Sequence, residues 1–144
     1  MMLYLDTSSL AKLYVHEPGT DEVRGLVEDA TVVATSRIAY AELRAALARR
    51  RRERTLSPRE FVAAKLAFEA DWPRLVAIEV TAAICHNAGD LAEQYRLRGF
   101  DSVHLASFAE VLRGAGEIEV RFSSFDDRLN RAARRLARGG GPVQ

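Results

Sequence analysis

The most informative stretch of the chain lies at its N-terminus, where an apolar run stops at a carboxylate. Residues 3–5 are apolar without alternation, which is typical of a parallel strand covered on both faces. Residues 8–14 place their apolar side chains at the i, i+3, i+4 spacing of a helix. Asp6 therefore falls where a strand passes into a helix, and open parallel α/β sheets form their sites at that edge. The alternative is that Asp6 or Thr7 only caps the following helix.

The rest of the chain repeats this alternation. Apolar periodicity predicts further strands near residues 31–35, 75–80 and 118–122. It predicts the remaining helices at about residues 20–27, 36–54, 57–72, 81–98, 101–113 and 126–136. Such alternation favours a parallel sheet between helices. We expect an α/β fold, a three-layer α/β/α sandwich whose mainly parallel sheet has four or five strands, with the last strand at an edge.

Length and composition limit the class of protein. The 144 residues are 48% hydrophobic and 28% charged, which favours a globular domain over a disordered chain. We expect one domain over residues 1–138 and a flexible tail at residues 139–144. No apolar run approaches the roughly 20 residues of a membrane-spanning helix, and no signal peptide opens the chain, so we expect a cytoplasmic protein without a membrane partner. The only cysteine, Cys85, falls within a helical pattern and is expected to be buried and inert.

Four acidic residues fall where they could meet at one end of the sheet. Asp6 and Asp126 follow predicted strands, and Asp101 opens a predicted helix. Glu42 lies six residues past Ser36 on an alanine-rich helix, about 9 Å along the axis, and helical side chains lean back toward the N-terminus. Taken singly, Glu42 could be a solvated charge, and each aspartate could be a helix cap or first-turn acid.

Taken together, the four acids indicate a metal site. Carboxylates that share a cleft repel one another, and a divalent cation relieves that repulsion. Oxygen donors without a cluster of cysteine and histidine favour Mg²⁺, with Mn²⁺ as a substitute, over Zn²⁺. His104 lies three residues after Asp101 on the same helical face, where it could support Asp101 or simply be packed in the core.

Five short segments, in this order and spacing, resemble those of a PIN domain. They are Leu5-Asp6-Thr7-Ser8, residues 14–19, residues 36–43, residues 99–106 and residues 124–129. Within that family the chain resembles the VapC-type toxin ribonucleases of prokaryotic toxin–antitoxin pairs. The resemblance implies a parallel sheet with flanking helices, a homodimer, and a small antitoxin partner whose C-terminal segment covers or enters the site.

The resemblance also implies the residues of the site. The family's acidic positions fall on Asp6, Glu42, Asp101 and Asp126, and three of them, Asp6, Asp101 and Asp126, would bind the metal ion. Glu42 would be a further ligand or a base that orients water. Supporting positions fall on Thr7, Ser8, Ser124 and Asp127, and Asp127 competes with Asp126 for the place that faces the metal. The implied reaction is hydrolysis of RNA phosphodiester bonds that leaves a 5′-phosphate and a 3′-hydroxyl.

Arginines supply the expected contacts to the RNA substrate. The last predicted helix carries Arg131, Arg134, Arg135 and Arg138 at offsets 0, 3, 4 and 7, opposite its apolar face. Residues 49–54 form a second basic cluster. The alternative for either cluster is a solvated helix face.

Two other functions remain open. A PIN-like domain without activity could bind RNA or a protein partner. A phosphoryl-accepting α/β domain could use Asp6 as its nucleophile, although the chain lacks the Asp-x-Asp pair of haloacid dehalogenases. No G-x-x-x-x-G-K-[ST] segment is present, which argues against a P-loop nucleotide-binding enzyme.

Overall fold

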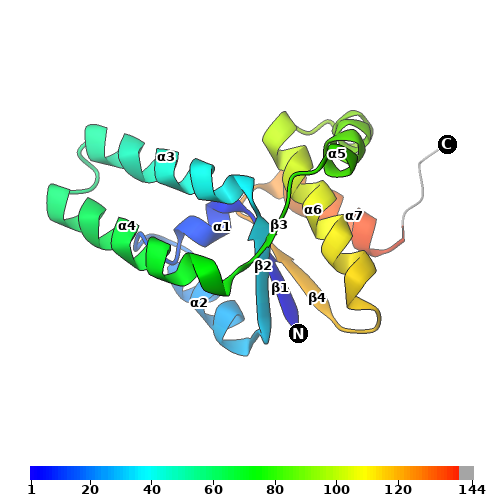
Figure 1. Ribbon diagram of the computed structural model, residues 1–144, viewed down its shortest axis with the longest axis horizontal. Coiled ribbons are helices and arrows are strands. Elements are labelled where there is room, and N and C mark those ends of the chain that lie inside the picture. Colours follow the sequence, from blue (N-terminus) through cyan, green and yellow to red (C-terminus); the bar gives the residue numbers. More distant parts are fainter. Residues whose placement is uncertain (140–144) are drawn as a thin grey trace.

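Four parallel strands form the centre of the computed structural model, which describes residues 1–139 (Figure 1). Their order across the sheet is β3-β2-β1-β4. The strands are β1 (Met2–Leu5), β2 (Val32–Ser36), β3 (Val76–Ile78) and β4 (Val120–Ser123). Because β1 lies between β2 and β4 and all pairs are parallel, the carboxyl ends of these strands meet at one edge.

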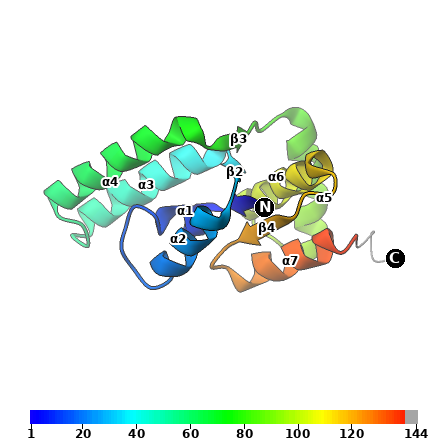
Figure 2. The same ribbon diagram turned by 90° about the horizontal axis from the view of Figure 1, so that it is seen from below.

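Helices cover both faces of the sheet, as predicted (Figures 1 and 2). One face carries α1 (Thr7–Ala11), α2 (Thr20–Asp29), α3 (Ile38–Arg52) and α4 (Pro58–Asp71), followed by the short 3-10 helix η1 (Trp72–Arg74). The other face carries α5 (Ala82–Tyr95), α6 (Gly99–Ala115) and α7 (Asp127–Ala137).

Strand β1 separates two hydrophobic cores. Tyr4 belongs to the core under α5, α6 and α7, whereas Leu3 and Leu5 belong to the core under α1 to α4. All three side chains are fully buried. A strand that is buried on both faces cannot alternate polar and apolar residues, which explains the apolar run in the sequence.

Most predicted elements are confirmed, with differences at their ends. The last strand lies at an edge, as expected, but begins at Val120 rather than residue 118. Ile118 instead lies in a turn, where its N–H donates to the carbonyl of Ala115. The helix expected from residue 101 begins at Gly99, because the preceding helix already ends at Tyr95.

The prediction for Cys85 is wrong, since its side chain is exposed. Helix α5 faces its core through Ile84, Ala88 and Leu91, and Cys85 lies off that face. Of the predicted tail at residues 139–144, all but Gly139 lies outside the described residues. Within residues 1–139, no helix is long and apolar enough to cross a membrane.

Candidate active site

Asp6 is tightly held at the end of β1. One carboxylate oxygen, Oδ1, accepts hydrogen bonds from the backbone N–H of Ser9 at 2.9 Å and from the hydroxyl of Ser8 at 2.7 Å. The other, Oδ2, accepts from the hydroxyl of Ser124 at 2.6 Å. Asp6 is thus the N-cap of α1 and also the link between the ends of β1 and β4. With both oxygens bonded and only 4% of the residue exposed, Asp6 is poorly placed to accept a phosphoryl group.

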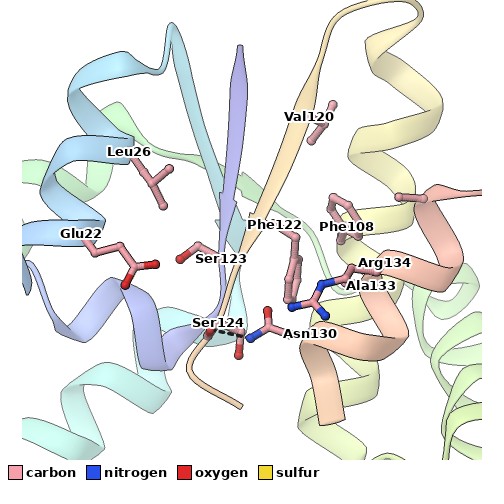
Figure 3. A pocket seen from close by; sticks show the side chains of 11 residues that line it. Glu22, Leu26, Phe108, Val120, Phe122, Ser123, Ser124, Asn130, Ala133 and Arg134 are labelled. Carbon is pink, nitrogen blue, oxygen red and sulfur yellow. Dashed lines mark hydrogen bonds between the residues drawn. The ribbon is translucent and has the colours of Figure 1, made fainter. Parts of the chain in front are cut away.

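Two hydroxyl groups, those of Ser8 and Ser124, join the loop after β4 to the start of α1. The hydroxyl of Ser124, besides donating to Asp6, accepts from the backbone N–H of Asp126 at 3.0 Å. The hydroxyl of Ser8 accepts from the backbone N–H of Phe125 at 3.0 Å. From the other side, the Asn130 side chain donates to the carbonyl of Ser124 at 2.8 Å, drawn as a dashed line in Figure 3. These bonds set the position of the loop that carries Asp126.

Glu42 is anchored through one of its two oxygens. Its Oε1 accepts from the Thr7 hydroxyl at 2.6 Å and lies 2.8 Å from Nε2 of His104. Its Oε2 accepts no hydrogen bond from any residue of the described chain. Burial raises the pKa of Glu42, but the hydrogen bonds with His104 and Thr7 outweigh that effect and hold the pKa below its ordinary value. Glu42 is therefore an ionised, oriented carboxylate and not a freely solvated charge.

His104 connects Glu42 to the interior of the protein. It is 2% exposed, and its Nδ1 lies 2.8 Å from the hydroxyl of the fully buried Tyr4. Burial raises the pKa of Tyr4 well above its ordinary value, so the phenol keeps its proton and can donate it to Nδ1. Nε2 then carries the hydrogen that is shared with Glu42.

Sequence reasoning missed this chain of contacts. The sequence left two roles for His104, support of Asp101 or packing in the core. The structure buries His104 and pairs it with Glu42, 62 residues away. Tyr4 gave one signal, a hydroxyl within an otherwise apolar strand. A buried hydroxyl needs a partner, but the sequence does not say which residue that partner is.

Asp101 and Asp126 line one cavity together with Glu42. The cavity has a volume of 590 Å³, and Arg98, Gly99 and Phe100 complete its lining. Asp101 is a first-turn residue of α6, and Asp126 is the N-cap of α7, where its Oδ1 accepts from the N–H of Leu129 at 2.9 Å. Asp127 does not line this cavity and lies in the first turn of α7.

The charges of the neighbouring acids change the pKa of Asp101. Burial raises the pKa of Asp101, and the nearby carboxylates of Asp126, Asp6 and Glu42 raise it further, while His104 opposes the shift. Sequence reasoning expected these four acids to meet at one end of the sheet. Glu42, Asp101 and Asp126 line one cavity there, whereas Asp6 lies at the end of β1 outside the lining of that cavity. Their mutual repulsion is what a cation bound between them would relieve.

The donor chemistry fits a hard divalent ion. Carboxylate oxygens are the ligands that Mg²⁺ and Mn²⁺ prefer, and Asp101, Asp126 and Asp6 would hold such an ion. Within residues 1–139, no three side chains of histidine, cysteine, aspartate or glutamate are gathered closely enough to form a finished ion site. The carboxylates therefore have the chemistry that a divalent ion requires, but in this structure they lie too far apart to bind one ion together.

An apolar groove lies directly beside the acidic cavity. It has a volume of 550 Å³ and shares Glu42 and Phe100 with that cavity. Its walls are small residues of α3, its far end carries two arginines, and Phe100 is 65% exposed; the remaining lining residues are Ile38, Ala41, Ala45, Ala46, Arg49 and Arg52. The alanines that surround Glu42 in the sequence thus leave room for a ligand or a partner.

The arginines expected to contact RNA do not share one surface. Arg131 and Arg135 line a cavity between α5 and α7. Arg134 lines a different pocket of 360 Å³, drawn in Figure 3, whose opposite wall is formed by Glu22 and Leu26 of α2. Arg138 lies at the C-terminal end of α7 and lines neither.

Comparison with known proteins agrees with this geometry. The family model described as PIN domain matches residues 3–135. The chain is 35% identical over 132 residues to ribonuclease VapC45 and to ribonuclease VapC49, both from Mycobacterium tuberculosis, and each match covers 92% of this chain and 89% of the relative. The fold is similar to the crystal structure of VapC20 from the same organism, described as a sarcin-ricin loop cleaving toxin, with a TM-score of 0.65 at 23% identity, covering 90% of this chain and 94% of that one. The chain therefore belongs to the PIN domain family, among the VapC ribonucleases.

Proposed function

We propose that this protein is a divalent-metal-dependent endoribonuclease and the toxin of a type II toxin–antitoxin system. The observation that carries this proposal is the cavity where Glu42, Asp101 and Asp126 meet, with Asp6 bonded to the adjoining loop. Membership of a family whose similar members are named ribonucleases supports it. Nucleases of this family generally depend on divalent metal ions. We propose Mg²⁺ as the ion, with Mn²⁺ as a substitute, because the donors are carboxylate oxygens.

Each residue of the cavity has a distinct task in this proposal. A bound divalent ion would neutralise charge on the phosphodiester and make water a stronger nucleophile. Asp6, Asp101 and Asp126 would hold the ion. Glu42 uses its unbonded Oε2 to accept a proton from the attacking water and to aim it at phosphorus. Arg98, on the cavity wall, offers a guanidinium to the phosphoryl oxygens.

The partners and location follow from the same proposal. The substrate is RNA, and a small cognate antitoxin neutralises the enzyme. The apolar groove beside Glu42 supports this pairing, because a segment bound there would also cover the acidic cavity. We further propose a homodimer in the cytoplasm, with the nuclease domain spanning residues 1–138.

The deciding experiment compares RNA cleavage by the wild type and by three variants, each with Mg²⁺, with Mn²⁺ and with excess chelator. Asp101→Asn and Glu42→Gln should each lower the rate by about 100-fold or more, because each removes a carboxylate from the cavity. Asp127→Asn is the matched control, since Asp127 is the neighbouring acid outside the cavity, and it should keep most of the activity.

The products provide a second check. Attack by water should leave a 5′-phosphate and a 3′-hydroxyl. Cleavage in chelator, cleavage by Asp101→Asn at the wild-type rate, or a 2′,3′-cyclic phosphate would each overturn the mechanism. A domain that binds RNA without cutting it would show no metal-dependent product on any RNA offered.

A further inference from the structure

A cavity rich in arginine lies between the end of α5 and one side of α7. It has a volume of 350 Å³, and we call it the arginine pocket; it is lined by Gln94, Tyr95, Arg96, Arg128, Arg131, Ala132 and Arg135. We propose that the arginine pocket binds phosphate groups of the RNA strand on one side of the cleavage site. This inference rests on the proposed ribonuclease function and names where the substrate extends beyond the acidic cavity.

The charge of the arginine pocket is not compensated by protein groups. None of its lining residues is acidic, and none of its four arginines forms an ion pair with a carboxylate of residues 1–139. Other arginines of the chain do pair, for example Arg44 with Glu69 and Arg50 with Glu17, both at 2.7 Å. No carboxylate of residues 1–139 therefore competes with an anion for these guanidinium groups. A guanidinium suits a phosphate because its donors can bind two oxygens at once.

Contacts within the pocket hold its parts in place. Arg96 ends α5 in the left-handed conformation, with φ of 55°, which turns its carbonyl toward α7. Arg128 donates from Nη1 to that carbonyl at 3.2 Å. The guanidinium of Arg135 lies 5.9 Å from the ring centre of Tyr95, within the range of a cation–π contact. The pocket is thus formed by side chains of two elements, the end of α5 and α7, which the Arg128 hydrogen bond and the Arg135–Tyr95 contact join.

The chain connects the arginine pocket to the acidic cavity at two points. Arg96 lies two residues before Arg98, which lines the acidic cavity, and Arg128 lies two residues after Asp126. Along α7, Arg131 and Arg135 follow Asp126 by five and nine residues, or about 7.5 and 13.5 Å at the helical rise. At roughly 3.4 Å per nucleotide of a stacked strand, these distances correspond to about two to four nucleotides.

This arrangement changes the set of RNA contacts predicted from the sequence. The helical stripe suggested Arg131, Arg134, Arg135 and Arg138 as one surface. Of these four, Arg131 and Arg135 line the arginine pocket. Arg96, at the end of α5, and Arg128, in the first turn of α7, line it too and were not part of the predicted set. Arg134 faces the pocket that contains the carboxylate of Glu22, which would repel a phosphate (Figure 3).

The test measures RNA binding without cleavage. Fluorescence anisotropy with a labelled single-stranded RNA of mixed sequence is recorded in chelator, at several salt concentrations, for the wild type, Arg131→Gln, Arg135→Gln and their combination. Each substitution should weaken binding by about threefold to tenfold and reduce the slope of log K against log salt by about 0.7. Arg134→Gln is the matched control, since it removes the same charge from the same helix outside the pocket, and it should change binding by less than about twofold.

Two results would overturn the proposal. Unchanged binding by the double variant would show that RNA does not use the pocket, and an equal loss with Arg134→Gln would reduce the effect to overall charge. A labelled hexaglutamate peptide tests the other possible ligand, an acidic protein segment. If the double variant no longer binds this peptide but still binds RNA as the wild type does, the pocket belongs to an acidic protein segment. Because binding is measured in chelator, it is independent of cleavage. Weakened RNA binding by the double variant, with no nuclease activity of the wild type, would support the arginine pocket and reject the proposed enzyme. Cleavage by the wild type, with unchanged RNA binding by the double variant, would support the enzyme and reject the pocket.

Discussion

The two carboxylate oxygens of Glu42 have different surroundings. Oε1 is occupied by Thr7 and His104, and Oε2 remains for the cavity. The orientation of His104 is set in turn by the buried hydroxyl of Tyr4. A catalytic group gains precision when the residues behind it are locked in this way. His104 and Tyr4 are therefore positioning residues for Glu42 and do not themselves reach the proposed substrate.

Replacement of His104 tests this role. His104→Phe should lower kcat by about 10-fold to 100-fold with little change in KM, because His104 is buried and the variant frees Glu42 to rotate. His104→Gln, which can still donate to Glu42, should recover much of the loss. The hydrogen bond with His104 lowers the pKa of Glu42, so in His104→Phe that pKa rises and the acidic limb of the pH–rate profile should move to higher pH.

Thermal melts of both variants separate positioning from packing. If His104→Phe and His104→Gln lose stability equally while kcat and the pH profile stay at wild-type values, His104 only fills the core. The expected pattern is the opposite, with the two variants differing in kcat more than in melting temperature.

At the scale of elements, the loop before α2 packs against the loop that carries Asp126. Gly19 is the N-cap of α2 and has φ of 98°, a conformation that favours glycine. A Cβ atom at this position would lie 2.6 Å from Cε1 of Phe125. On the ring of the same Phe125 lies the ammonium group of Lys12, 4.5 Å from the ring centre. Phe125 stands between Ser124 and Asp126, so the shape of one loop supports the site on the other.

Gly19→Ala should therefore disturb both stability and activity. We expect a loss of about 1–3 kcal/mol in the free energy of unfolding, from backbone strain and the clash with Phe125. RNA cleavage should fall as well, because the ring of Phe125 has to move and Phe125 lies between Ser124 and Asp126. Gly89→Ala is the control: Gly89 lies inside α5 with open space around its Cβ position, and the substitution should stabilise by about 0.5–1 kcal/mol without changing activity. Urea unfolding and a cleavage assay measure both effects, and equal behaviour of the two variants would contradict the role given to the Phe125 contact.

At the scale of the whole molecule, the parallel sheet brings several carboxylates to one edge, and their mutual repulsion lowers the stability of the folded protein. The pKa of Asp101 is raised above its unfolded value of 3.8 by burial and by the surrounding carboxylates. A raised pKa means that the folded protein prefers the protonated acid. The stability this provides is fully present below pH 3.8 and is lost as the pH rises through the raised pKa. Glu42 has the opposite sign, since its lowered pKa favours folding above the unfolded value and loses that contribution in acid.

Asp101→Asn should thus stabilise the metal-free protein at neutral pH while abolishing its activity. We expect the melting temperature in chelator to rise by about 2 °C, because the substitution removes one of the repelling charges. Mn²⁺ or Mg²⁺ should raise the melting temperature of the wild type through binding to the folded state, and this increment should shrink or vanish in Asp101→Asn. An equal metal-induced increment in both proteins would place the ion elsewhere.

Much of the fold could be predicted because its determinants are local. The strand at residues 3–5 and the helices expected from about residues 57 and 81 each depend on near neighbours in the chain, and the structure confirms all three. In the structure, Ser57 and Glu60 form a capping box at the start of α4, and Thr81 is the N-cap of α5. That Asp6 and Asp126 lie at the same edge could be expected too, since each follows a strand and parallel strands share one carboxyl edge.

The sequence by itself thus determined the order of strands and helices and the end of the sheet at which the acidic residues lie. Tertiary structure alone decided that His104 supports Glu42, that Asp126 rather than Asp127 lines the cavity, and that Cys85 is exposed. It also divided the arginines of α7 between two pockets. The physical reason is the same throughout: periodicity and capping are set within a few residues, whereas the partner of a side chain depends on how helices far apart in the chain pack against one sheet.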